Sequence, residues 1–112
     1  MKMQIFGVKK CFDTKKAERY FKERRIRYHF IDLTIKGLSK GELQSVKSAV
    51  GLENLINRES KSYRNLNMNR IVSGSGREEL LLNNPDLYNT PIVRNGKQAT
   101  LGYSPEVWST WE

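Results

Sequence analysis

Residues 3–21, MQIFGVKKCFDTKKAERYF, decide the fold that this sequence predicts. The apolar run from Met3 to Val8 is short and is interrupted by a glycine before two lysines, which is typical of a β-strand and its end. Beyond Cys11, apolar residues recur among charged ones at helical spacing. A strand followed closely by a helix therefore places Cys11 at the N-terminus of that helix.

The next part of the chain repeats this order of elements. Residues 27–33 are rich in tyrosine, phenylalanine and isoleucine and predict a second strand. Ser39 and Glu42 then form a capping box ahead of a helix that should end at Gly51. Because a helix connects the two strands, we expect them to run parallel.

The middle of the chain, residues 52–89, contains no convincing strand and predicts a helical insertion. Short helices are expected in its first part, where apolar residues are spaced by three or four. Ser75 and Glu78 form a second capping box ahead of a leucine run, so a longer helix should begin there.

The end of the chain predicts a hairpin and a final helix. Residues 91–94 and 98–101 flank Asn95-Gly96-Lys97, a tight connection that favours antiparallel pairing. Ser104 and Pro105 supply a helix cap and a proline at the first helical position. The prediction is an α/β fold: a mixed four-stranded sheet with flanking helices and a helical insertion between a β-α-β-α half and a β-β-α half.

Length and composition limit the kinds of protein that this chain can be. With 112 residues, 38% of them hydrophobic, we expect one domain over residues 1–112. The first apolar run is too short for a signal peptide or a membrane span, so a cytoplasmic protein without membrane contact is expected. One cysteine and one histidine predict neither an internal disulfide nor a metal site, and we expect no bound cofactor. The net charge of +8 favours anionic partners.

Cys11 is the candidate nucleophile. At a helix N-terminus it faces free backbone N–H groups and the positive end of the helix dipole, which stabilise a thiolate. Neighbouring lysines, Lys10 among them, add positive charge. A lowered pKa would make the thiolate abundant at neutral pH and able to attack a disulfide or an oxyanion. The alternative is that Cys11 is a buried, unreactive side chain, as many free cysteines are.

A redox cycle at Cys11 needs a thiol from outside the chain. The position three residues beyond, where a Cys-x-x-Cys site has its second cysteine, is Thr14. Glutathione, a cysteine of another protein or a second copy of this chain could resolve an adduct on Cys11. Glutathione is anionic, so the basic surroundings favour it.

Three segments, residues 7–17, 90–93 and 101–106, resemble the arsenate reductase and Spx family. The resemblance implies a thioredoxin-like fold and a cis Thr90-Pro91 bond beside the cysteine. In the reductases of that family this cysteine attacks arsenate, and glutathione and glutaredoxin supply electrons. The resemblance therefore implies a catalytic Cys11, and we expect Lys10, Arg58, Thr90 and Pro91 to contact the substrate.

The chain departs from this family at two arginine positions, where it has Thr90 and Tyr103. An arginine fork is the usual way to hold such an oxyanion, so the departures argue against arsenate as the substrate. We expect a small anionic substrate or a protein disulfide. The alternative is a transcription regulator of the Spx type that binds RNA polymerase, although Thr14 removes the disulfide switch of those regulators. Nonspecific nucleic-acid binding through the net charge is a weaker third hypothesis.

Overall fold

The sheet of the computed structural model has four strands in the order β2-β1-β3-β4. The structure describes residues 3–71 and 73–111, so residues 1, 2, 72 and 112 of the expected domain and insertion lie outside the described residues. β1 pairs parallel with β2 and antiparallel with β3, which pairs antiparallel with β4. The predicted mixed sheet is confirmed, and its strands are β1 (Met3–Gly7), β2 (His29–Asp32), β3 (Ile92–Asn95) and β4 (Gln98–Leu101).

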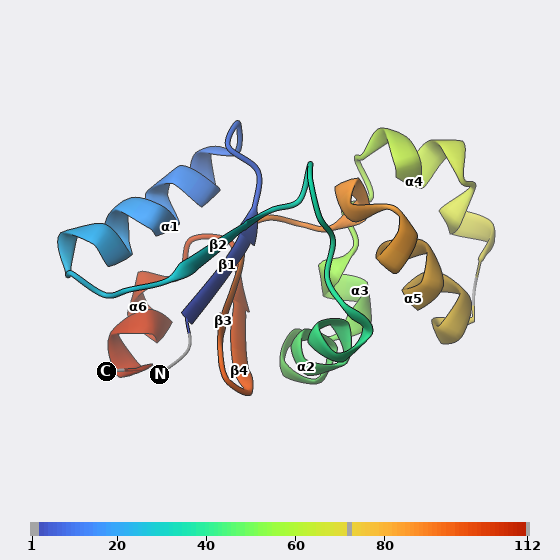
Figure 1. The fold of residues 1–112 in the computed structure, drawn as a ribbon. Helices are drawn as coiled ribbons and strands as arrows, with labels where there is room; N and C mark the ends of the chain where they lie inside the picture. Colours follow the sequence, from blue (N-terminus) through green and yellow to red (C-terminus); the bar gives the residue numbers. More distant parts are fainter. Residues whose placement is uncertain (1–2, 72, 112) are drawn as a thin grey trace.

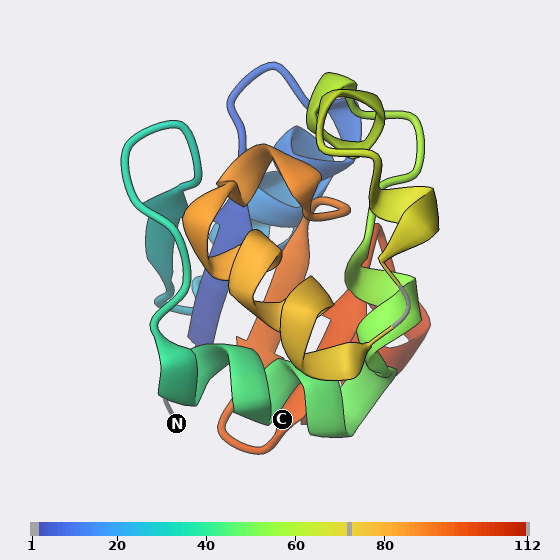
Figure 2. The same ribbon diagram turned by 90° about the vertical axis from the view of Figure 1, so that its right-hand side faces the viewer.

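Helices lie on both sides of this sheet (Figure 1). One side carries α1 (Phe12–Glu23) and α6 (Pro105–Trp108). The other side carries the second helix of the first half and the helical insertion, which stands in front of the sheet in Figure 2. These helices are α2 (Lys40–Val50), α3 (Leu52–Leu55), α4 (Lys61–Asn65) and α5 (Gly74–Asn83). Short 3₁₀ turns follow α4, α5 and α6 at Met68–Arg70, Pro85–Leu87 and Ser109–Trp111.

The strands divide the apolar core between the two faces of the sheet. Successive side chains of a strand point to opposite faces. Ile5 and Val93 therefore pack with α1 and α6, while Phe6 and Ile92 pack with α2, α3 and α5. No helix among the described residues is both long and apolar enough to span a membrane.

The first predicted capping box is present. The Ser39 hydroxyl accepts a hydrogen bond from the Glu42 amide at 3.1 Å, and the Glu42 carboxylate accepts one from the Ser39 amide at 2.8 Å. α2 ends at Gly51, whose φ of 90° lies in the region that favours glycine. The start and the end of α2 follow directly from local sequence signals.

The second predicted capping box is wrong. α5 begins at Gly74, and its cap is Ser73, whose hydroxyl accepts from the Gly76 amide at 3.1 Å. The Glu78 carboxylate is used elsewhere, since it accepts hydrogen bonds from Gln44 and from the Lys47 ammonium at 2.6 and 3.1 Å. A tertiary contact with α2 thus displaces the local motif.

The side of the sheet that carries α1 is closed by an aromatic cluster with one internal hydrogen bond. The Trp108 ring lies 5.1 Å from that of Tyr20 and 5.0 Å from that of Phe21, centroid to centroid. Its indole N–H donates to the Thr100 hydroxyl at 2.7 Å, and both residues are buried. This bond fixes α6 against β4.

Replacing Thr100 tests the stability that this bond supplies. Thr100→Val keeps the shape but leaves the buried indole N–H without a partner, so we expect the free energy of unfolding to fall by about 1–3 kcal/mol. Urea denaturation followed by circular dichroism measures the change. Thr100→Ser keeps the hydroxyl and is the control; if both variants lose the same stability, the hydrogen bond is not the cause.

Candidate functional site

Cys11 caps the N-terminus of α1, as the sequence predicted. It follows a turn at Lys9 and Lys10, and its own amide donates to the Val8 carbonyl at 3.0 Å. Its backbone is extended (φ −74°, ψ 123°) and α1 begins at the next residue. The side chain is partly buried, so the sulfur is held by the fold yet reachable from solvent.

The sheet brings Thr90 to the same place from the far end of the chain. β1 leads to Cys11 at its carboxyl end, and the antiparallel β3 begins beside that end, at Ile92 opposite Phe6. The Cys11 sulfur lies 3.8 Å from the Thr90 carbonyl oxygen. The Thr90-Pro91 peptide bond is cis, as the resemblance implied.

Thr14 lies one helical turn beyond Cys11 and is completely buried. Among the described residues its hydroxyl has no hydrogen-bond partner. It fits only because position 7 is a glycine, since a Cβ on Gly7 would lie 2.6 Å from the Thr14 Oγ1. In the sequence, Thr14 was notable only as the residue at the position where a Cys-x-x-Cys site has its second cysteine. Its spacing from the helix cap is the signal that could have revealed its place beside the thiol.

These neighbours hold the pKa of Cys11 below its ordinary value. Burial raises the pKa of the thiol, but the Thr14 and Thr90 hydroxyls and the amides of Thr14 and Asp13 stand ready to donate to the thiolate, and their effect outweighs that of burial. The expected direction is confirmed, and the expected cause is confirmed in part, since the two amides are free N–H groups of the helix N-terminus while the threonine hydroxyls were not expected. Lys10 and the lysines that follow Cys11 are exposed, so solvent and salt screen their charges.

No hydrogen bond or ion pair of the described residues joins the side chain of Lys10 or Arg58, the two cations expected at the site, to Cys11. Lys10 is exposed in the turn before Cys11. The Arg58 guanidinium lies 3.5 Å from the Glu53 carboxylate, and no hydrogen bond or ion pair of the described residues joins it to Cys11. Its part in the site stays a prediction.

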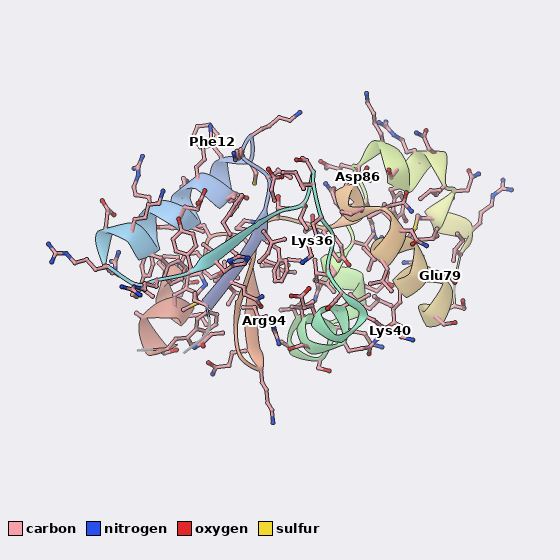
Figure 3. All side chains as sticks on the ribbon, viewed as in Figure 1. Phe12, Lys36, Lys40, Glu79, Asp86 and Arg94 are labelled. Atoms are coloured by element: carbon pink, nitrogen blue, oxygen red, sulfur yellow. The ribbon has the colours of Figure 1, made fainter. Side chains whose placement is uncertain are left out.

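Two features complete the surroundings of Cys11. Phe12, at the start of α1, is 79% exposed (Figure 3). Tyr103 is brought near the site because the Gly102 amide donates to the Pro91 carbonyl at 2.9 Å. Within residues 3–71 and 73–111, no three histidine, cysteine or acidic side chains gather to hold a metal ion.

Together, the mixed sheet and a cysteine at the N-terminus of α1 beside a cis-proline define a thioredoxin-like protein with a single-cysteine site. The chain belongs to the ArsC family, whose model matches residues 6–111. The expected membership of the arsenate reductase and Spx family is therefore confirmed.

Similar proteins include both kinds of family member. A global transcriptional regulator from Oceanobacillus iheyensis, Spx 2, is 29% identical over 106 residues, which are 92% of this chain and 78% of the regulator. An arsenate reductase from Vibrio cholerae is 22% identical, with a TM-score of 0.84 over 96% of this chain and 94% of that one. An arsenate reductase related protein from Brucella melitensis is 26% identical, with a TM-score of 0.69 over 99% and 94% of the two chains. These likenesses support a thiol-based redox protein or a regulator of the Spx type.

Replacing Thr14 tests the origin of the lowered pKa. Thr14→Val removes the hydroxyl and keeps the shape, so we expect the pKa of Cys11 to rise and alkylation by iodoacetamide at pH 7 to slow by about three- to tenfold. The pH dependence of the alkylation rate gives the pKa directly. Thr14→Ser keeps the donor and should resemble the parent protein.

Stability provides a second readout of the same variant. The Thr14 hydroxyl has no partner in the described structure while Cys11 is a thiol, so Thr14→Val should not lower the free energy of unfolding at a pH below the pKa that the alkylation profile gives for Cys11. A large loss of stability there, or an unchanged pKa of Cys11, would contradict the assigned contact.

Proposed function

We propose that this chain is a thiol-dependent oxidoreductase whose nucleophile is the Cys11 thiolate and whose resolving partner is an external thiol such as glutathione. The observation that carries the proposal is the set of groups around the sulfur. Two threonine hydroxyls and two backbone amides face Cys11 and lower its pKa. A cysteine that is merely buried has no such set of donors, and desolvation alone would raise its pKa.

The proposed chemistry is two successive thiol–disulfide exchanges. In the first, the Cys11 thiolate attacks one sulfur of a disulfide, a mixed disulfide forms on Cys11, and the other sulfur leaves as a thiolate. In the second, the thiolate of an external thiol attacks the mixed disulfide and releases Cys11 as a thiolate again. Cys11 returns to its starting state, one external thiol is consumed, and the rest of the substrate leaves as a mixed disulfide with that thiol. A second external thiol attacks this mixed disulfide, so that two thiols together supply the two electrons and end as their own disulfide.

The partner thiol has to come from another molecule because the sequence contains one cysteine. The position that would hold a second cysteine is Thr14, whose hydroxyl instead stabilises the attacking sulfur. Glutathione suits the basic chain, which carries a formal charge of +8, and glutaredoxin or another protein thiol could take the same part.

A disulfide is the better substrate than arsenate because Arg58, the arginine expected at the site, and Arg94, on β3, are both held by other side chains. Arg58 pairs with Glu53 at 3.5 Å. Arg94 lies between β3 and α2 (Figure 3), where it donates to Gln4 at 2.6 Å and to Ser45 at 3.2 Å. A dianionic oxyanion needs a fork of cationic donors at the nucleophile. A disulfide carries no charge at its reacting sulfur atoms and therefore needs no such donors.

Mass spectrometry of the protein after incubation with oxidised glutathione, arsenate or uncharged disulfides tests this proposal directly. We expect a mixed disulfide on Cys11 with the disulfides, its removal by reduced glutathione, and no arsenate turnover. Cys11→Ser should abolish both the adduct and any reductase activity. A thiol that alkylates no faster than free cysteine at pH 7 would contradict the proposal, and arsenate turnover would contradict the choice of substrate.

The alternative function is a regulator of the Spx type that contacts RNA polymerase. The observation in its favour is the 29% identity to Spx 2 over most of both chains. Affinity purification of the tagged protein and of its Cys11→Ser variant separates the two functions. Polymerase that copurifies equally with both variants supports the regulator, whereas the reductase predicts disulfide-linked partners that Cys11→Ser loses.

A further inference from the structure

A charged groove runs along α1 on the side where the chain enters α6. It encloses a cavity of about 370 Å³, within the range of small-ligand sites. α1 and α6 lie on the same side of the sheet (Figure 1). Three cations, one carboxylate and an aromatic ring line the groove: Lys16, Arg19, Arg24, Glu23 and Tyr103.

Tyr103 links the groove to the segment that carries Thr90 and Pro91. The Lys16 ammonium lies 5.6 Å from the centre of the Tyr103 ring. Tyr103 follows Gly102, whose amide binds the Pro91 carbonyl next to Thr90. A molecule held at Lys16 therefore lies within reach of the sulfur. On an α-helix, Lys16 is about 7.5 Å along the axis from Cys11 and Arg24 about 12 Å further.

Two of the three cations of the groove lie over aromatic rings, and none of the three belongs to an ion pair among the described residues. The Arg24 guanidinium stacks at 3.7 Å from the centre of the Tyr20 ring and donates to the Tyr20 carbonyl at 3.3 Å. Lys16 is held over Tyr103 in the same way. The ion pairs among the described residues involve Lys47, Arg58 and Arg77 with Glu53 or Glu78, and none lies in the groove. Cations held in this way lose little freedom when an anion binds.

We propose that this groove binds the peptide part of the molecule that exchanges disulfides with Cys11, an anionic peptide thiol or its disulfide. The inference rests on the proposed function. Carboxylates of the peptide pair with Lys16 and Arg19, its backbone lies against Tyr103, and a free ammonium group, where the peptide has one, pairs with Glu23. Glutathione and an acidic segment of a protein share this chemistry, since both present carboxylates within a few residues of a cysteine.

The length of the groove distinguishes these two sources. An extended tripeptide spans about 10 Å, so glutathione linked to Cys11 reaches Lys16, about 7.5 Å along the helix axis. Arg19, about 12 Å away, is met only through the length of its own side chain, and Arg24, about 19.5 Å away, is out of reach. A longer acidic segment reaches all three cations. A rate of mixed-disulfide formation that falls when Arg24 is replaced therefore indicates a protein partner. An unchanged rate indicates the tripeptide.

The rate of mixed-disulfide formation, measured by quenched-flow mass spectrometry, tests the proposal with charged and uncharged disulfides. For a Lys16→Ala/Arg19→Ala variant at low ionic strength, we expect the rate with oxidised glutathione to fall about tenfold and the rate with hydroxyethyl disulfide to stay unchanged. Lys22→Ala is the matched control, because Lys22 is an exposed cation of α1 outside the groove. Equal effects of the double variant on both disulfides, or an effect no larger than that of Lys22→Ala, would overturn the inference.

Arg24→Ala separates the two sources of the peptide. The probes are oxidised glutathione and the disulfide of an eight-residue peptide with an N-terminal cysteine followed by aspartates, which extends about 23 Å beyond the cysteine and so reaches Arg24. If Arg24→Ala slows mixed-disulfide formation with the longer peptide alone, the groove is assigned to an acidic protein segment. If Arg24→Ala slows the reaction with neither probe, while the Lys16→Ala/Arg19→Ala variant does slow it, the groove is assigned to the tripeptide.

Binding without chemistry keeps this inference distinct from the proposed function. S-methylglutathione has no thiol and cannot react, so an NMR titration with it reports the groove alone. We expect amide shifts at Lys16, Arg19 and Tyr103 that disappear in the double variant. Binding without any reaction of Cys11 would refute the proposed function and keep the groove, whereas a reactive Cys11 without these shifts would refute the groove.

Discussion

The antiparallel pairing of β1 with β3 is the interaction on which the candidate site depends. It places the end of β1, which leads to Cys11, beside the start of β3, which follows Thr90 and Pro91. The two sides of the site are 79 residues apart in the chain, and the sulfur meets the Thr90 carbonyl at 3.8 Å. The helical insertion connects these two sides across the opposite face of the sheet (Figure 2), so it need not contribute a group to the sulfur.

The same strands explain why both faces of the sheet have to be covered. β1 carries Ile5 toward α1 and Phe6 toward α2, so each face needs apolar partners from a different part of the chain. α1 meets this need on one side with Ala17, Tyr20 and Phe21, and this packing fixes its N-terminus beside the end of β1. The core and the thiol site thus share one helix. The charged groove adjoins this packed face, and Tyr20 lines both.

The sequence predicted most of the fold because the deciding signals are local. The strand before Cys11, the capping box of Ser39 and the hairpin around Gly96 each depend on residues a few positions apart, and all are present. The capping box expected at Ser75 failed because Glu78 is bound by two side chains of α2, a contact that no local pattern contains.

The chemistry of the site was predictable only in part, because some of its contacts join segments that are distant in the sequence. Cys11 at a helix N-terminus followed from the pattern of residues 3–21, whereas the lysines nearby proved to be exposed. The groups that lower the pKa are the Thr14 and Thr90 hydroxyls, and their positions require the packing of α1 on Gly7 and the pairing of β1 with β3. The spacing from the helix cap indicates the place of Thr14, whereas that of Thr90 depends on the pairing of strands that are distant in the sequence.

The donors that lower the pKa of Cys11 also couple its chemistry to folding. Because that pKa is lower in the folded chain than in the unfolded one, ionisation of Cys11 stabilises the fold. This contribution is fully present above the pKa of the unfolded thiol and is lost as the pH falls through the lower folded value. A mixed disulfide on Cys11 has no charge, so it removes the same contribution and leaves the Thr14 hydroxyl without a thiolate to bind. The adduct is therefore less stable relative to the free thiolate, which favours its resolution by a second thiol.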